Sequence, residues 1–240
     1  MSLTKITELL TINGAGKSVV LDGFDFTGNG FVKILNAASV EIRNCRVYGL
    51  NVEKAPKNYW LHVNSSAPLK LTIERCYFGA NPGVQGALYN LIEPNVVLAD
   101  GTSISNNYFA KKCCTHNTIN LYGAAESSCI NVSSNVFELS AGTIRIGVKG
   151  QPTCTIAMDG NVIHKHDSAY ALDYAGLVTV QPYGKQTLSF ANMTINMNGN
   201  EAPTEQIIYG YSGSNDTALT DALMPTICID GTEVTAPIYH

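Results

Sequence analysis

A pattern of eight residues recurs along this chain and constrains its fold more than any other feature. Apolar residues dominate the first, third and eighth positions, and a turn-tolerant residue usually stands fifth. Copies of the pattern begin at Val19, Val40, Leu71, Thr102, Ile130, Ile156, Leu188 and Ile227. Apolar side chains at alternate positions indicate strands, whereas a helix needs them three and four residues apart. Each copy therefore predicts a strand, a sharp bend and a second short strand.

A second set of alternating apolar residues lies between most copies. It comprises Val32–Ile34, Leu61–Val63, Ile119–Leu121, Ile144–Val148, Val178–Val180 and Ile207–Tyr209. A unit of two or three short strands cannot bury its apolar side alone, but stacked units bury a continuous core. The sequence therefore predicts an all-β fold, a parallel β-helix (solenoid) of about eight coils. A β-sandwich also has short strands at regular intervals and is the alternative.

The sixth position of the pattern favours the β-helix over the sandwich. Its residues in five consecutive copies are Cys45, Cys76, Asn107, Asn135 and Asn161. Equivalent residues of successive coils lie about 4.8 Å apart, so inward Asn side chains at this spacing can hydrogen-bond as a ladder. We therefore predict a structural ladder of these five residues. The competing interpretation is turn preference alone, because Asn tolerates left-handed backbone geometry.

Two phrases of the repeat, VEIRNCRVYG and TSISNNYFA, resemble coils of the pectin-lyase-like superfamily. The resemblance covers roughly residues 18–235 and implies a right-handed parallel β-helix. It says much less about function, because that superfamily holds lyases, hydrolases, bacteriophage tailspikes and inert virion components.

The ends of a stack expose strand edges and need caps. Residues 2–10 place Leu3, Ile6, Leu9 and Leu10 on one helical face, which predicts a short N-terminal capping helix. We expect a cap over residues 1–17 and a single β-helix domain over residues 18–240, with a longer C-terminal coil.

Composition and charge exclude several classes of partner. The formal charge of −4 gives no basic footprint, so no nucleic-acid partner is expected. The sequence shows no signal peptide and no apolar run of bilayer length, so we expect no membrane partner and synthesis in a host cytoplasm. The seven cysteines are interpreted as buried free thiols.

The residues that catalysis needs are not found in the repeat. Glycoside hydrolysis needs two carboxylates about 5–10 Å apart. Among the outward fourth positions only Asp22, Arg43 and Glu74 cluster, and they form an alternating-charge row that predicts a structural role. The Asn-Thr-Asp, Asp-Asp and Gly-His-Gly motifs of polygalacturonase-like members are missing. We therefore predict no catalytic residues and no cofactor.

If the chain were instead a polysaccharide-cleaving enzyme, its catalytic carboxylates could act in a pair across a subunit boundary. The candidates are Asp159, Asp167, Asp173 and Asp216.

Three other motifs lack the partner residues that a functional site needs. His164 and His166 share one side of a strand but have no further metal ligand in prospect, so no metal site is expected. Arg145 and Lys149 resemble a substrate-binding pair of pectate lyases, without the acidic cluster that accompanies it. Cys113 lacks an oxyanion device and is interpreted as an ordinary thiol.

These observations favour a non-enzymatic structural protein of a bacteriophage virion, a capsid decoration or a tail-associated component, that binds other virion proteins. The resemblance implies a homotrimer, and the 12 tyrosines suit contact surfaces. The alternatives are a tailspike-like polysaccharide depolymerase and a β-helix that binds a surface glycan without cleaving it.

Overall fold

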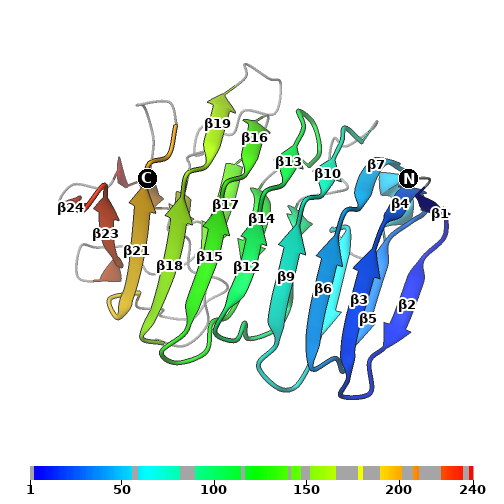
Figure 1. Cartoon of the computed structure of the whole chain (residues 1–240). Coiled ribbons are helices and arrows are strands. Elements are labelled where there is room, and N and C mark those ends of the chain that lie inside the picture. The colour runs from blue at the N-terminus through cyan, green and yellow to red at the C-terminus, as the bar shows by residue number, and fades with distance from the viewer. Residues whose placement is uncertain are drawn as a thin grey trace.

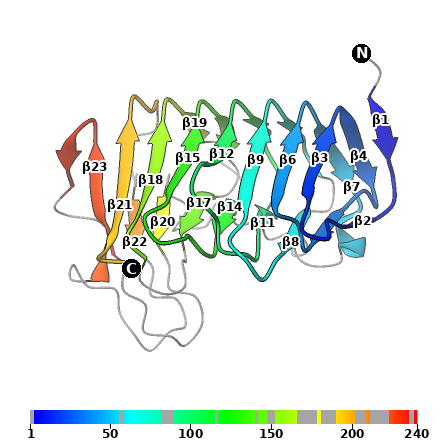
Figure 2. The same cartoon turned by 60° about the horizontal axis from the view of Figure 1, so that its bottom comes forward.

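The computed structural model of the chain is all-β, as the sequence predicts. It describes residues 3–55, 59–81, 90–114, 117–139, 142–146, 152–165, 178–180, 190–201, 208–210, 223–234 and 238–239. In this part of the chain the strands are joined by turns and by one short 3₁₀ helix, η1 (Val52–Lys54). They form three sheets, called A, B and C here, and the chain visits the three in turn (Figures 1 and 2).

Sheet A contains seven strands. They are β1 (Thr4–Ile6), β4 (Phe24–Gly28), β7 (Arg46–Leu50), β10 (Tyr77–Phe78), β13 (Tyr108–Phe109), β16 (Val136–Leu139) and β19 (Val162–Lys165). Each pairs in parallel with the strand three places later in the chain. After β19 the described residues continue the row as a bridge between Val162 and Glu201.

Sheet B contains nine strands, again all parallel. They are β2 (Leu10–Asn13), β5 (Val32–Leu35), β8 (Leu61–Asn64), β11 (Asn90–Ile92), β14 (Asn117–Leu121), β17 (Gly142–Ile146), β20 (Val178–Val180), β22 (Ile208–Gly210) and β25 (Ile238–Tyr239). The alternating segments found between the copies of the repeat lie in this sheet as far as the structure describes them, which leaves out Val148 and Ile207. Sequence reasoning places the last of them one residue out of phase, because Ile208 and not Ile207 pairs with inward Val178.

Sheet C carries the first strand of each copy of the repeat. Its parallel strands are β3 (Ser18–Asp22), β6 (Ser39–Arg43), β9 (Lys70–Glu74), β12 (Thr102–Ser105), β15 (Cys129–Ser133), β18 (Cys154–Asp159), β21 (Met193–Asn198) and β23 (Thr226–Ile229). They lie side by side along the molecule, with the termini at opposite ends (Figure 1). This stacking of parallel strands is consistent with the predicted β-helix of about eight coils.

The last copy of the repeat ends in a hairpin, where the others bend into sheet A. After β23 the chain turns at Asp230 and Gly231, which have φ of +47° and +76°. It then returns as β24 (Thr232–Glu233), antiparallel to β23. Asp-Gly is a preferred pair for a two-residue hairpin that needs positive φ at both positions. The hairpin occupies the C-terminal edge of sheet C.

The N-terminal helix predicted from Leu3, Ile6, Leu9 and Leu10 is wrong. Residues 4–6 and 10–13 form β1 and β2, which pair with β4 and β5 of the next coil. A spacing of four residues fits a helical face, but it also fits two inward positions on strands. Here the open edge of the next coil supplies main-chain partners for both strands, and Leu9 is left 45% exposed.

A left-handed residue makes each bend from sheet C into sheet A possible. It is the fifth residue of the repeat, where a positive φ turns the chain while the following residue points inward again. The residues are Gly23, Asn44, Arg75, Asn106, Ser134, Gly160 and Gly199, with φ between +53° and +74°. Gly and Asn suit this geometry, whereas Arg75 and Ser134 are held in it by the stacked neighbours.

Side chains from all three sheets fill one continuous core. The rings of Phe78, Phe109 and Phe137 stack along sheet A, with successive centroids 4.8 Å apart. Trp60 is fully buried, contacts Phe78 edge-on at 5.5 Å and donates through Nε1 to Gly30 O. Stacking like residues at the coil spacing thus builds the interior from one repeated layer.

Candidate functional site

A polar row of side chains at the bends recurs from coil to coil in the described part of the chain. Asn107, Asn135 and Asn161 are each at most 2% exposed and lie directly above one another. Nδ2 of Asn107 donates to Oδ1 of Asn135 at 3.0 Å, and Nδ2 of Asn135 donates to Oδ1 of Asn161 at 3.1 Å. The structure therefore brings these three predicted residues together as a ladder.

Each ladder amide also ties its coil to the main chain of the preceding coil. For Asn135, Oδ1 accepts the main-chain N–H of Asn107 at 3.0 Å and Nδ2 donates to Ile104 O at 2.9 Å. Asn161 makes the equivalent bonds to the N–H of Asn135 and to Val132 O. The inward bend would otherwise leave these main-chain groups buried without partners, so the row holds the coils together.

The ladder has one more member than sequence reasoning found. Asn200 accepts from the main-chain N–H and from Nδ2 of Asn161, and it donates to Met158 O. The seventh copy of the repeat therefore begins at Ile195, not Leu188, because Ile195 pairs with Ile156 and Met197 pairs with Met158. The signal was present in the sequence as Ile-Asn-Met-Asn-Gly-Asn, with Gly at the bend.

Cys45 and Cys76 occupy the same row in the first part of the stack. Their thiols lie where the amide donor would: Sγ of Cys45 is 3.6 Å from Leu21 O, and Sγ of Cys76 is 3.8 Å from Ile42 O. Each thiol is closer to a carbonyl of its own coil, at 3.1 Å for Arg43 O and 3.3 Å for Glu74 O. A hydrogen bond between the two thiols lowers the pKa of Cys45 and, with burial, raises that of Cys76. A thiol sulfur is a much weaker acceptor than an amide oxygen, so this end of the row is less well bonded.

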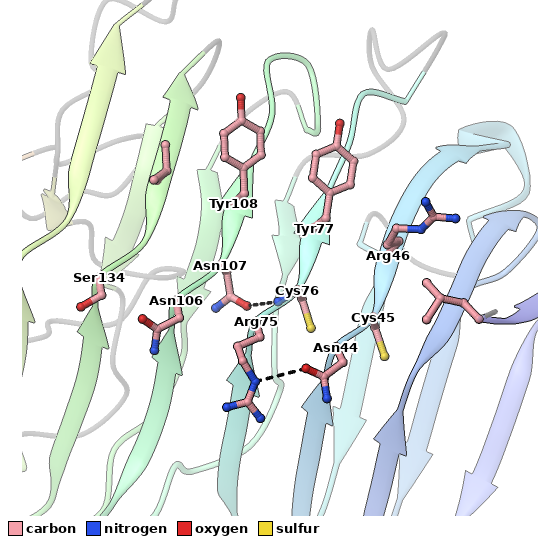
Figure 3. A pocket seen from close by; sticks show the side chains of 12 residues that line it. Asn44, Cys45, Arg46, Arg75, Cys76, Tyr77, Asn106, Asn107, Tyr108 and Ser134 are labelled. Carbon is pink, nitrogen blue, oxygen red and sulfur yellow. Dashed lines mark hydrogen bonds between the residues drawn. The ribbon is translucent and has the colours of Figure 1, made fainter. Parts of the chain in front are cut away.

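An open groove of about 640 Å³ runs along the bends outside this row (Figure 3). Tyr77 and Tyr108 project beside it, with parallel rings 5.6 Å apart and 43% and 38% of each residue exposed. Its cations are already paired, Arg46 with Asp25 at 3.0 Å and Arg75 with Glu74 at 2.6 Å. The groove therefore offers phenol edges and amides and has no free positive charge for an anion.

Of the four alternative acids, only Asp159 lies in the described part of the chain. Its Oδ1 accepts from the main-chain N–H and Nδ2 of Asn198 in the next coil, at 3.2 and 2.9 Å. These bonds give the carboxylate a structural partner. Asp167, Asp173 and Asp216 lie outside the described residues.

The histidine pair, Cys113 and the Arg145–Lys149 pair are described only in part by the structure. Nδ1 of His164 lies 3.0 Å from Oε1 of Glu138, within hydrogen-bonding distance, on the exterior of sheet A, whereas His166 lies outside the described residues. Cys113 is buried. Arg145 is on β17, and Lys149 is outside the described residues.

A polar group on the outer side of sheet B was missed by sequence reasoning. Glu93 follows β11 and is only 8% exposed, although its neighbour Ile92 takes the inward position. Its Oε1 accepts from the hydroxyl of Tyr122 at 2.9 Å, and its Oε2 accepts from Nδ2 of Asn120 at 3.2 Å. Asn120 is paired in register with Arg145 of the next coil. No repeat marks Glu93, so only the coil register reveals this group.

No family model, curated protein or solved structure matches the chain. Over the described ranges no helix has the length and apolar character needed to cross a membrane. In the same part of the chain, His, Cys, Asp and Glu side chains form no group of three or more able to hold a metal ion.

Proposed function

We propose that this chain is a right-handed parallel β-helix of the pectin-lyase-like kind and serves as a non-enzymatic structural protein of a bacteriophage virion. Its partners would be other virion proteins, in a capsid decoration or a tail-associated component. The homotrimer implied by the sequence resemblance is part of this proposal.

The observation that carries the proposal is how the polar side chains of the stack are used. The ladder amides bond between coils, Asp159 bonds to Asn198, and Asp22 bonds to Arg43 at 2.9 Å. Amides and carboxylates that bond one coil to the next stabilise the stack, and while so bonded they do not act as catalytic acids or bases. A long rigid body with exposed tyrosines such as Tyr77 suits a part that binds its neighbours.

Sedimentation with virus particles tests this proposal. Particles are purified on a density gradient from the source of the sequence and probed with an antibody against the purified chain. We expect the chain to band with the particles and to resist a wash in high salt, while a soluble host enzyme stays at the top. Recovery of the chain only in the soluble fraction would contradict a virion role.

A further inference from the structure

The two ends of the stack differ in how their strand edges are covered. At the C-terminal end of sheet C, β24 occupies the edge of β23. At the N-terminal end, β1, β2 and β3 are the outermost strands of their sheets among the described residues, and each pairs on one side only. An uncovered strand edge presents main-chain N–H and C=O groups to any chain that can pair with it.

The free main-chain groups of β3 can be identified from its bonds. Gly23 donates its N–H to Arg43 O at 3.1 Å, so the peptide that joins Asp22 to Gly23 points its N–H toward the second coil and the C=O of Asp22 away from it. Main-chain groups of successive residues in a strand point to opposite sides. Ser18, Val20 and Asp22 therefore direct their N–H and C=O groups away from the stack.

We propose that a second copy of this chain pairs with β3, antiparallel, across a two-fold axis that passes through Val20. In this register Val20 faces Val20 of the partner subunit, and Ser18 faces Asp22 of the partner subunit. Each of these pairs exchanges two hydrogen bonds, so every free main-chain group of β3 is used. The strand is thus complementary to itself, as a two-fold contact requires.

The side chains of β3 support the same register. Val20 points outward and is 49% exposed, more than the other large exposed apolar residues of the described part. Across the axis it meets its own copy, so the two side chains cover each other. The hydroxyl of Ser18 lies opposite the carboxylate of Asp22 of the partner subunit, which pairs a donor with an acceptor.

The remaining two sheets fit the same axis. A two-fold axis through sheet C, perpendicular to the stack, exchanges sheets A and B, so β1 lies against β2 of the partner subunit. Ile6 on β1 and Leu10 and Ile12 on β2 are only partly buried in the single chain. The contact covers them and joins two cores end to end.

Light scattering on the purified full chain tests the contact. Val20→Lys places two ammonium groups opposite each other at the axis, and this outward position leaves the core unchanged. We expect this change to halve the mass of the assembly, from two chains of 25.7 kDa to one, or from six to three if the proposed trimer also forms. Val97→Lys, at another valine that is 43% exposed, is the control and should leave the mass unchanged.

Cross-linking tests the register itself. Val20→Cys treated with a short bis-maleimide should give a covalent dimer on a denaturing gel, whereas Val97→Cys and the wild type should not. A wild-type monomer, or a mass that Val20→Lys leaves unchanged while circular dichroism shows a folded chain, overturns the proposal. So does failure of Val20→Cys to cross-link.

Discussion

Removing one amide from the middle of the ladder should destabilise the whole fold. Asn135→Ala deprives the N–H of Asn107 of its acceptor and Ile104 O of a donor, and both lie beside a residue that is 0% exposed. Each buried main-chain group left without a partner costs about 1–3 kcal/mol. We therefore expect the free energy of unfolding to fall by about 2–6 kcal/mol. For a chain of this length, even the lower value decreases Tm by about 4–8 °C.

Urea unfolding followed by far-ultraviolet circular dichroism and by Trp60 fluorescence measures this loss. The matched control is Asn131→Ala, because Asn131 lies on the preceding strand but points outward and is only partly buried. Its removal should cost less than about 0.5 kcal/mol. Asn135→Asp separates hydrogen bonding from volume: it keeps the size of the side chain but replaces the donor with an oxygen, so it should also destabilise at neutral pH.

The reasoning is refuted if Asn135→Ala costs no more than Asn131→Ala. That result would mean that water or a shift of the main chain satisfies the groups at the bend. The row would then reflect the preference of Asn for turns and not a bonded ladder.

Three further predictions concern other residues of the stack. Cys76→Asn should stabilise the fold, because the new amide donates to Ile42 O and its oxygen is an acceptor that the thiol lacks. We expect calorimetry to show a gain of about 1 kcal/mol, or about 2–4 °C in Tm. No gain would count against the equivalence of position 76 and the Asn positions of the ladder. A hydrogen bond from Asn44 lowers the pKa of Asp22, so its carboxylate stabilises the fold above its ordinary pKa of 3.8 and loses this effect as the pH falls further. Asp22→Asn should therefore lower the urea midpoint at pH 7 but not at pH 2, and an equal loss at both would contradict this. Burial raises the pKa of Cys154 from 9.0 to about 11, so stability should decline as the pH rises from 9 to 11, and Cys154→Ala should weaken that decline in urea titrations at pH 8 and 10.5.

The strands of sheet C could be predicted from the sequence because the alternation of apolar residues is local. Leu71 and Ile73 both point inward because side chains two residues apart on a strand face the same side. The bend after them needs only one left-handed residue. Register between coils was harder. The sequence alternates both in Leu188–Ile195 and in Ile195–Asn200, so either segment could be the seventh copy of the repeat. Only the pairing of Ile195 with Ile156 decides which one it is.

The candidate site could be predicted only where it repeats. Asn107 and its successors recur at one position, so stacking them was enough to find a ladder. Glu93 has no counterpart at one position of the repeat, and its bonds to Asn120 and Tyr122 form only when the next coil stacks on its own. The prediction of an N-terminal helix failed for a related reason. The spacing of Ile6 and Leu10 suits a helix as well as strands, and the strands form because they pair with the second coil, which is distant in sequence.

The ladder has a direction, and this bears on how the molecule is made. Every amide in it bonds to the main chain of the coil before it, as Asn161 does to Val132 O. A coil emerging from the ribosome therefore completes the bend of its predecessor, and its own bend waits for the next. The chain can grow as a finished structure during synthesis, with a single incomplete layer at its moving front.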